Sequence, residues 1–270
     1  MNNHTIYIPP PNNQNPLSDN SLKNLNEMID ELHRSFGLIM FKGGTEWEDM
    51  DIEEIAYLKQ IGTSNIPSLM KVGGLESKSE MRHLLDLNVE VLLGPMIETQ
   101  FALEKFVKNA LLISQRKNKT VRLAMMVESI TCFNNLDNIM SSPYFESIDF
   151  VVLGRLDLAN SIGKQDVDNI EVQQLSKKII KKVTAKGKQI SLGGFVNPKS
   201  AITIKNDFGV DMLNTIHLLF DLNKSTNISQ SVRLGLQFEK AFYQSLCNLF
   251  PKRAEFYQTR IQMTEKKLTY

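Results

Sequence analysis

The sequence predicts an α/β fold in which short parallel strands alternate with helices. Apolar runs recur along the chain, each too short for a buried helix, and several are rich in β-branched residues. Amphipathic stretches separate them, so that one strand and one helix together take roughly 25–35 residues. Strands joined by such crossover helices run parallel. Eight of these units in roughly 220 residues predict a (β/α)8 TIM barrel with additional C-terminal helices.

The strands follow from the apolar runs, taken in order. Residues 5–8 (Thr-Ile-Tyr-Ile) are the first predicted strand and bring the count to eight. The other seven lie within 36–41, 66–72, 89–93, 121–127, 148–153, 189–192 and 210–216. A doubly wound open sheet is the alternative, but no G-x-G-x-x-G segment follows the first strand.

Helices are predicted between the strands and beyond the last one. After a Pro/Asn-rich loop, Ser18 or Asp19 can cap a helix that runs to about Arg34. The helices between strands lie within 52–60, 78–87, 102–115, 134–140, 172–186 and 198–206. A long helix over 229–249 and a shorter one over 252–263 follow the barrel. They either close the barrel or reach a neighbouring subunit.

We therefore expect residues 1–270 to form one barrel domain. Residues 1–20 are its N-terminal strand and loop, and residues 228–270 are its C-terminal helical extension. The apolar face of the long C-terminal helix needs a surface to cover it once the barrel is complete, which favours a homo-oligomer. This face consists of Val232, Leu236, Phe238, Phe242 and Leu246.

Composition excludes several classes of protein. The 31 Lys and Arg residues against 30 Asp and Glu residues give a net charge of +1, so no overall field favours nucleic acid. No apolar run approaches the roughly 18 residues of a membrane span, and the N-terminus lacks the pattern of a secretory signal. Cys132 and Cys247 have no metal-like spacing. We expect a cytoplasmic protein without a disulfide scaffold.

Charged residues follow several strands, where the active site of a barrel lies. Such charges need partners, because burying them unpaired is costly. A divalent metal on the carboxylates and an anionic substrate on the cations would satisfy both sets. The cations are Lys42, Lys71 and Arg155, and the carboxylates are Glu46, Glu128 and Asp157.

Glu128 and Asp157 are the predicted metal ligands. They follow adjacent strands, so their side chains can converge on one ion. Two carboxylates without Cys or His suit Mg²⁺ or Mn²⁺, with substrate and water in the remaining positions. Three Gly-Gly pairs also follow strands, and one of them, Gly73-Gly74, would let the backbone approach a substrate.

Three segments resemble the HpcH/HpaI aldolase and citrate lyase β-subunit family, of the phosphoenolpyruvate/pyruvate-binding TIM barrel superfamily. Residues 154–163 match its G-x-x-D-L-x-x-x-[LI]-G motif, whose Asp binds the metal and is Asp157 here. Residues 127–129 are similar to its [IV]-E-[ST] segment, whose Glu is the other metal ligand, here Glu128. Residues 95–99 are similar to its P-M-[VI]-E-[ST] segment.

The resemblance implies a metal-dependent carbon–carbon lyase or aldolase, or the reverse condensation. The metal would hold the enolate of a 2-oxo acid (pyruvate- or oxaloacetate-like) or of an acyl-CoA. The small anionic substrate can also be phosphorylated, and the matched segments place Gly154, Leu156 and Met96 against it. The resemblance further implies a trimer or hexamer in which the last helix packs on a neighbour.

Two departures from the family pattern affect the chemistry. Lys71 stands where the family has an Arg, and Lys42-Gly43-Gly44-Thr45-Glu46 replaces the D-x-E-[HD] motif with its acid/base residue. Lys71, alone or with Lys42, would then stabilise the enolate oxygen. A metal-bound water or Glu46 would take the alcohol proton, while a Schiff base on either lysine is the alternative.

Two other functions remain open from the sequence. One is a phosphopyruvate-using transferase of the same superfamily, since glycines near Lys42 and Lys71 would also suit a phosphate. The other is a lyase-like barrel that has lost catalysis and binds a ligand or partner, which the two departures would explain.

Overall fold

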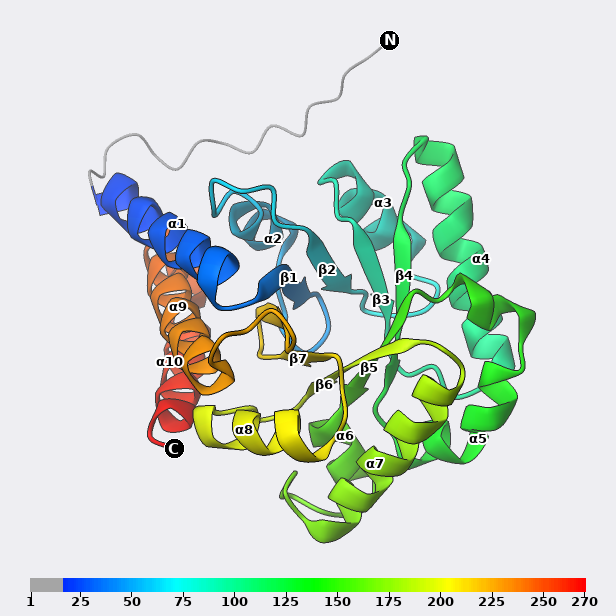
Figure 1. The fold of residues 1–270 in the computed structure, drawn as a ribbon. Helices are drawn as coiled ribbons and strands as arrows, with labels where there is room; N and C mark the ends of the chain where they lie inside the picture. Colours follow the sequence, from blue (N-terminus) through cyan, green and yellow to red (C-terminus); the bar gives the residue numbers. More distant parts are fainter. Residues whose placement is uncertain (1–16) are drawn as a thin grey trace.

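Eight strands close into one barrel in a computed structural model that describes residues 17–270 (Figure 1). Neighbouring strands from β1 to β7 pair in parallel, and β8 is antiparallel to both β7 and β1. The fold class predicted from the sequence is therefore confirmed. The strands are β1 (Leu38–Gly44), β2 (Ser68–Lys71), β3 (Val91–Gly94), β4 (Arg122–Val127), β5 (Phe150–Gly154), β6 (Gln189–Gly193), β7 (Met212–Asn214) and β8 (Leu218–Asp221).

The strand that completes the barrel is not the predicted one. Residues 5–8 lie outside the described part of the chain, and the barrel closes without them. After β7 the chain reverses in a tight turn, in which the Thr215 N–H donates to the Leu218 carbonyl at 2.9 Å, and returns as β8. Three residues cannot hold a crossover helix, so the last strand has to be antiparallel.

Helices surround the barrel on its outside (Figure 1). Each predicted helix is present, and the one that the sequence missed is α6, which begins directly after β5. No helix in residues 17–270 is both long and apolar enough to cross a membrane. The helices are α1 (Leu17–Ser35), α2 (Ile52–Leu58), α3 (Lys78–Asp86), α4 (Gln100–Lys117), α5 (Ile130–Met140), α6 (Arg155–Ser161), α7 (Ile170–Ala185), α8 (Pro198–Asp207), α9 (Ile228–Leu249) and α10 (Ala254–Leu268).

Local chemistry fixes where several of these helices begin. The Thr99 and Ser129 hydroxyls accept the N–H groups of Ala102 and Cys132 at the first turns of α4 and α5. Such caps satisfy donors that have no partner within the helix. Because Thr99 and Ser129 follow strands β3 and β4 closely, each cap also ends the loop in which site residues lie.

Two apolar clusters give the barrel its stability. The larger one lies between the strands and the helices. The smaller one fills the interior of the barrel, as side chains do in a packed barrel rather than a pore. The interior cluster consists of Met40, Leu69, Val91, Leu93, Ala124, Met126, Phe150, Val152, Met212 and Leu219. A ligand therefore has access only to the ends of the strands.

The long C-terminal helix α9 packs on its own barrel, beside α1, α8 and α10 (Figure 1). Its apolar face is at most 1% exposed, so it needs no neighbouring subunit to cover it. The expectation that this face is buried on a neighbour is therefore wrong, because the face packs within the chain. The wider prediction of a homo-oligomer, a trimer or hexamer, stays a prediction.

Phe238 in α9 offers a test of this packing. Its ring is fully buried. The centroid of this ring lies 6.4 Å from the ring centroid of Phe41 and 6.0 Å from that of Phe242. Phe238→Ala should lower the free energy of unfolding by about 3–5 kcal/mol, because it leaves a cavity in the core. Urea denaturation measures this change.

Gln237→Ala, at the exposed neighbouring position, is the matched control and should change stability little. A loss of stability in Phe238→Ala that is no larger than in Gln237→Ala would contradict the packing of α9 on its own barrel.

Candidate active site at the barrel mouth

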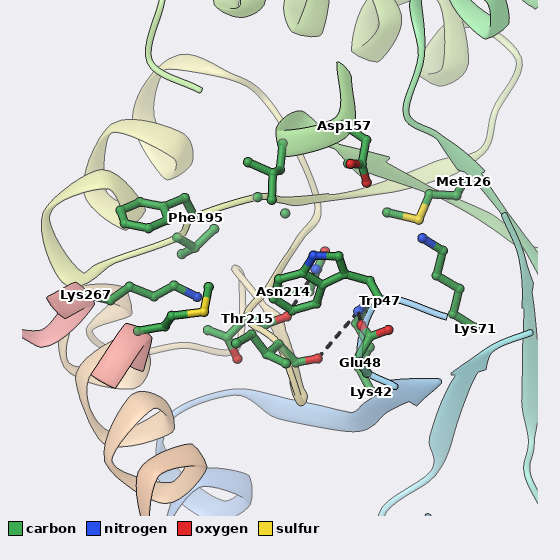
Figure 2. A pocket seen from close by; sticks show the side chains of 17 residues that line it. Lys42, Trp47, Glu48, Lys71, Met126, Asp157, Phe195, Asn214, Thr215 and Lys267 are labelled. Carbon is green, nitrogen blue, oxygen red and sulfur yellow. Dashed lines mark hydrogen bonds and ion pairs between the residues drawn. The ribbon is translucent and has the colours of Figure 1, made fainter. Parts of the chain in front are cut away.

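A pocket opens at the C-terminal ends of the strands (Figure 2). It is formed by strand ends, by the loops that follow them, and by the last helix, α10. Of the predicted site residues, Lys42, Lys71, Gly154, Leu156 and Asp157 line it. The other lining residues are Trp47, Glu48, Met126, Gly193, Gly194, Phe195, Val196, Asn214, Thr215, Ile216, Met263 and Lys267.

Lys71, the last residue of β2, is the centre of the charged side of this pocket. Its side chain is buried, and its Nζ lies 2.6 Å from Glu46 Oε2 and 3.1 Å from Glu128 Oε2. Burial lowers the pKa of Lys71, but the carboxylates of Glu128, Glu46 and Glu48 outweigh it and raise that pKa above its usual value. Lys71 is therefore a fixed ammonium, which argues against a Schiff base on this residue.

Glu128 follows β4 directly and is held from two sides. Its Oε1 accepts the Met96 N–H at 2.9 Å, while its Oε2 pairs with Lys71. Burial raises the pKa of Glu128, against the lowering effects of Lys71 and the Met96 N–H. Met96 thus acts through its backbone, and its half-exposed side chain does not line the pocket as the sequence led us to expect.

Asp157 lies in the first turn of α6 and lines the pocket. Burial raises its pKa, Lys71 lowers it, and Glu46 raises it further. The charge of Asp157 also raises the pKa of Glu128, so the two predicted ligands lie within electrostatic range of each other. That the two carboxylates converge on one metal ion stays a prediction.

A second buried ion pair joins Lys42, on β1, to Glu48 in the loop that follows it. Burial raises the pKa of Glu48, but Lys42 outweighs that effect and holds the pKa below its usual value. Within residues 17–270 the other carboxylate oxygen, Oε2, has no hydrogen-bond partner. Within the run Glu46-Trp47-Glu48 the sequence predicted Glu46 as a site residue and not Glu48, whose burial depends on the fold.

Arg155 does not contact the pocket, although we expected it to bind substrate. Its guanidinium is 1% exposed and donates to the carbonyls of Gly193 at 3.2 Å and Gly194 at 2.9 Å, and it pairs with Asp168 at 3.4 Å. The side chain turns behind the loop after β6 instead of towards the mouth. Arg155 therefore positions this loop, which lines the pocket, and is not a substrate ligand.

The Gly-Gly pairs serve the packing of the chain itself. The Gly73 N–H donates to the Glu80 carboxylate at 2.9 Å, and neither Gly73 nor Gly74 lines the pocket. At Gly193, which does line it, a Cβ would lie 2.3 Å from Asn214 Nδ2. Gly73 and Gly74, predicted as substrate contacts, thus lie outside this pocket.

The donor set limits which metal site is possible. No group of three or more His, Cys, Asp or Glu side chains in the described residues could hold a metal. Glu128 and Asp157 are hard oxygen donors of the kind that Mg²⁺ and Mn²⁺ prefer, and they fit a site that substrate and water complete. Of the two Glu128 oxygens, Oε2 would have to exchange Lys71 for the cation.

The C-terminal helix α10 contributes to the pocket, which the sequence analysis did not foresee. Met263 and Lys267 line it, and Arg260 stacks on Trp47 with its guanidinium 4.0 Å from the ring centroid. Arg260 also donates to the Trp47 carbonyl at 2.6 Å. The helix predicted from the sequence ended at residue 263 and did not include Lys267, whereas α10 runs to Leu268.

The sequence profile of the HpcH/HpaI aldolase/citrate lyase family matches residues 52–203. The match covers more than half of the chain. The chain belongs to the HpcH/HpaI aldolase/citrate lyase family. The matched span contains Lys71, Glu128 and Asp157 but neither Lys42 nor Lys267. The family supports a lyase- or aldolase-type function, and its members commonly depend on a divalent metal.

Solved structures from the HpcH/HpaI family are similar in fold. The HpcH/HpaI aldolase from Desulfitobacterium hafniense DCB-2 matches with a TM-score of 0.56 at 15% sequence identity. The matched region covers 70% of this chain and 80% of the aldolase chain. A family protein from Burkholderia cenocepacia J2315 has a TM-score of 0.53 at 16% identity, covering 78% and 97%. The citrate synthase SbnG has a TM-score of 0.52 at 17% identity, covering 71% and 90%. No curated protein matches the chain.

His217, in the turn before β8, is a buried histidine that contacts the backbone of the pocket residue Lys42. Its Nε2 lies 2.7 Å from the Tyr243 hydroxyl of α9, and its Nδ1 lies 3.1 Å from the Lys42 carbonyl. Burial lowers its pKa, which Glu239 and Glu48 only partly offset. The folded protein therefore keeps this imidazole neutral to a lower pH than the unfolded chain does.

We expect a pH dependence of stability from His217. A lowered pKa in the fold contributes stability that is fully present above the usual histidine pKa of about 6.5 and is lost as pH falls below it. In His217→Gln, unfolding midpoints should fall less between about pH 7.5 and pH 5 than in the wild type. His33→Gln, at an exposed position, should keep the wild-type slope. An unchanged slope in His217→Gln would contradict the assignment.

Proposed function

We propose that the protein is a divalent-metal-dependent carbon–carbon lyase or aldolase. It would act through the enolate of a 2-oxo acid or acyl-CoA substrate, or catalyse the reverse condensation. The observation that carries this proposal is the excess of carboxylates around Lys71. The membership in the HpcH/HpaI family and the donor type of Glu128 and Asp157 support it.

At the mouth of the barrel, the carboxylates around Lys71 outnumber its single positive charge. Three carboxylates, Glu46, Glu128 and Asp157, act on the single ammonium of Lys71, while the Lys42–Glu48 pair is neutral by itself. Around Lys71, three negative charges and one positive charge leave a local net charge of −2, with Lys267 on the other side of the pocket left out of the count. Uncompensated charge in a partly buried site is costly, and a divalent cation would neutralise it.

The roles of the residues follow from their positions. When bound by Glu128 and Asp157, a divalent cation supplies the Lewis acidity that polarises the oxygens of a 2-oxo acid. Lys71 places a permanent positive charge where negative charge develops on the enolate oxygen. Glu46, which is partly exposed and pairs with Lys71, would take the alcohol proton during cleavage.

Metal binding tests the two ligands without any substrate. Glu128→Gln and Asp157→Asn should each weaken Mn²⁺ binding at least about ten-fold, because each removes one of two hard anionic donors. Paramagnetic resonance or calorimetry on the full chain measures this. Asp137→Asn, at an exposed position on α5, is the control and should bind Mn²⁺ as the wild type does. Wild-type affinity in either ligand variant would rule out that ligand.

The role of Lys71 in catalysis is tested with aldols of 2-oxo acids as substrates. The rate of their cleavage is measured by the release of pyruvate. Lys71→Met should lower kcat/KM by about 10²–10³, the typical loss for one oxyanion donor. Lys71→Arg should retain part of the rate because it keeps the charge. The matched control is Lys78→Met, at an exposed site beyond the same strand.

Mn²⁺ binding should survive in Lys71→Met, since Glu128 Oε2 is then free for the metal. Full turnover by Lys71→Met would contradict the role of this lysine. A wild-type protein that binds Mn²⁺ but cleaves no 2-oxo acid aldol would instead favour a lyase-like binding protein.

A further inference from the structure

The Lys267 side chain is a charged feature of the pocket that the proposed reaction does not use. Lys267 lies in the last turn of α10 and is 4% exposed. Its side chain enters the pocket beside Phe195, on the side opposite Lys71 and Asp157 (Figure 2). In the described part of the chain, its ammonium forms no hydrogen bond and no ion pair within 4.0 Å.

The other two cations that line the pocket have carboxylate partners. Lys71 pairs with Glu46 and Glu128, and Lys42 pairs with Glu48. Lys71 is available to the enolate oxygen once a metal takes Glu128 Oε2 from it. Among the lysines of residues 17–270 that line the pocket, Lys267 is the one whose ammonium has no carboxylate within 4.0 Å.

The protein groups around Lys267 compensate its charge only in part. Glu239 of α9 attracts it, whereas Arg260 and Lys42 repel it. The Oε1 of Glu239 accepts the Thr215 hydroxyl at 2.6 Å and the His217 N–H at 2.7 Å, and among residues 17–270 its buried Oε2 has no hydrogen-bond partner, but neither oxygen lies within 4.0 Å of the Lys267 ammonium. The Phe195 ring, 5.6 Å from the Lys267 Nζ, offers only a weak cation–π contact.

A purely structural role explains the position less well. Cations favour the last turn of a helix, where they interact with its dipole. Lys266, the preceding residue, provides that charge from an exposed position. Lys267 as a whole is largely buried, whereas its ammonium, which forms no hydrogen bond or ion pair with the described residues, faces the pocket. Burial accordingly lowers the pKa of Lys267.

We propose that Lys267 is an anion-binding residue that recognises a carboxylate on the part of the substrate remote from the enolate. This assignment rests on the proposed function for the position of the enolate at Lys71 and Asp157. A single ammonium matches the single charge of a carboxylate, whereas a phosphate dianion would require a second cation at this end. Because α10 supplies the group, the chain's own C-terminal helix sets part of the specificity.

Calorimetry with two matched 2-oxo acids tests this inference on the full chain in the presence of Mn²⁺. 2-Oxoglutarate and 2-oxopentanoate have the same length and differ in a terminal carboxylate or methyl group. The wild type should bind 2-oxoglutarate at least ten-fold more tightly. Lys267→Gln should remove this preference, and Lys266→Gln should keep it. A preference that is absent in the wild type, or that Lys267→Gln leaves unchanged, overturns the proposal.

A second titration separates this inference from the proposed function. Pentanoate without metal carries one carboxylate and no 2-oxo group, so its binding does not depend on enolate chemistry. Its affinity should fall about ten-fold in Lys267→Gln, and pentanamide should bind neither protein. If 2-oxo acids gain nothing over pentanoate while this fall is seen, the proposed function fails and the Lys267 assignment stands.

Phosphate binding and the melting temperature are two further measurements that test the proposal. Inorganic phosphate that binds more tightly than pentanoate, and depends on Lys267, would overturn the carboxylate assignment. The melting temperature of the ligand-free protein should change little in Lys267→Gln, because the ammonium forms no hydrogen bond or ion pair in the described part of the chain. A clear fall in that variant, without one in Lys266→Gln, would show a structural role and overturn the proposal.

Discussion

The bridge that Lys71 makes between Glu46 and Glu128 is the interaction on which the mouth of the barrel depends. A parallel barrel brings the C-terminal ends of its strands to one side, so loops from β1, β2 and β4 meet there. Charges in that crowded space must be paired or bound by a ligand. The bridge joins these three loops, and it raises the pKa of Lys71 so that the ammonium stays charged.

The replacement of the family arginine by Lys71 has a geometric consequence. An arginine would offer a planar fork to a substrate carboxylate, whereas an ammonium is a compact charge that can lie between several oxygens. In this protein it lies between two carboxylates of its own chain. Under the proposal made for Lys267, recognition of a second substrate anion would fall to the other side of the pocket.

The C-terminal helices are part of the site and not an appendage. Helix α9 covers one side of the barrel, and α10 lies against the loop after β1 through the stacking of Arg260 on Trp47. Tyr257 of α10 also donates a buried hydrogen bond to Glu54 of α2, so α10 is joined to the adjoining helix as well. The solved HpcH/HpaI structures share the fold, while Lys267 lies beyond the span that the family profile matches.

The sequence by itself determined the barrel, the order of its strands up to β7, and the approach of Lys71, Glu128 and Asp157 to one another. Those features depend on local periodicity and on the rule that parallel strands end on the same side of a sheet. The tertiary structure alone decided the direction of β8, the inward turn of Arg155 and the entry of Lys267 into the pocket. These three features depend on contacts between segments that are distant in the sequence. Such contacts cannot be inferred from the local pattern of apolar and polar residues.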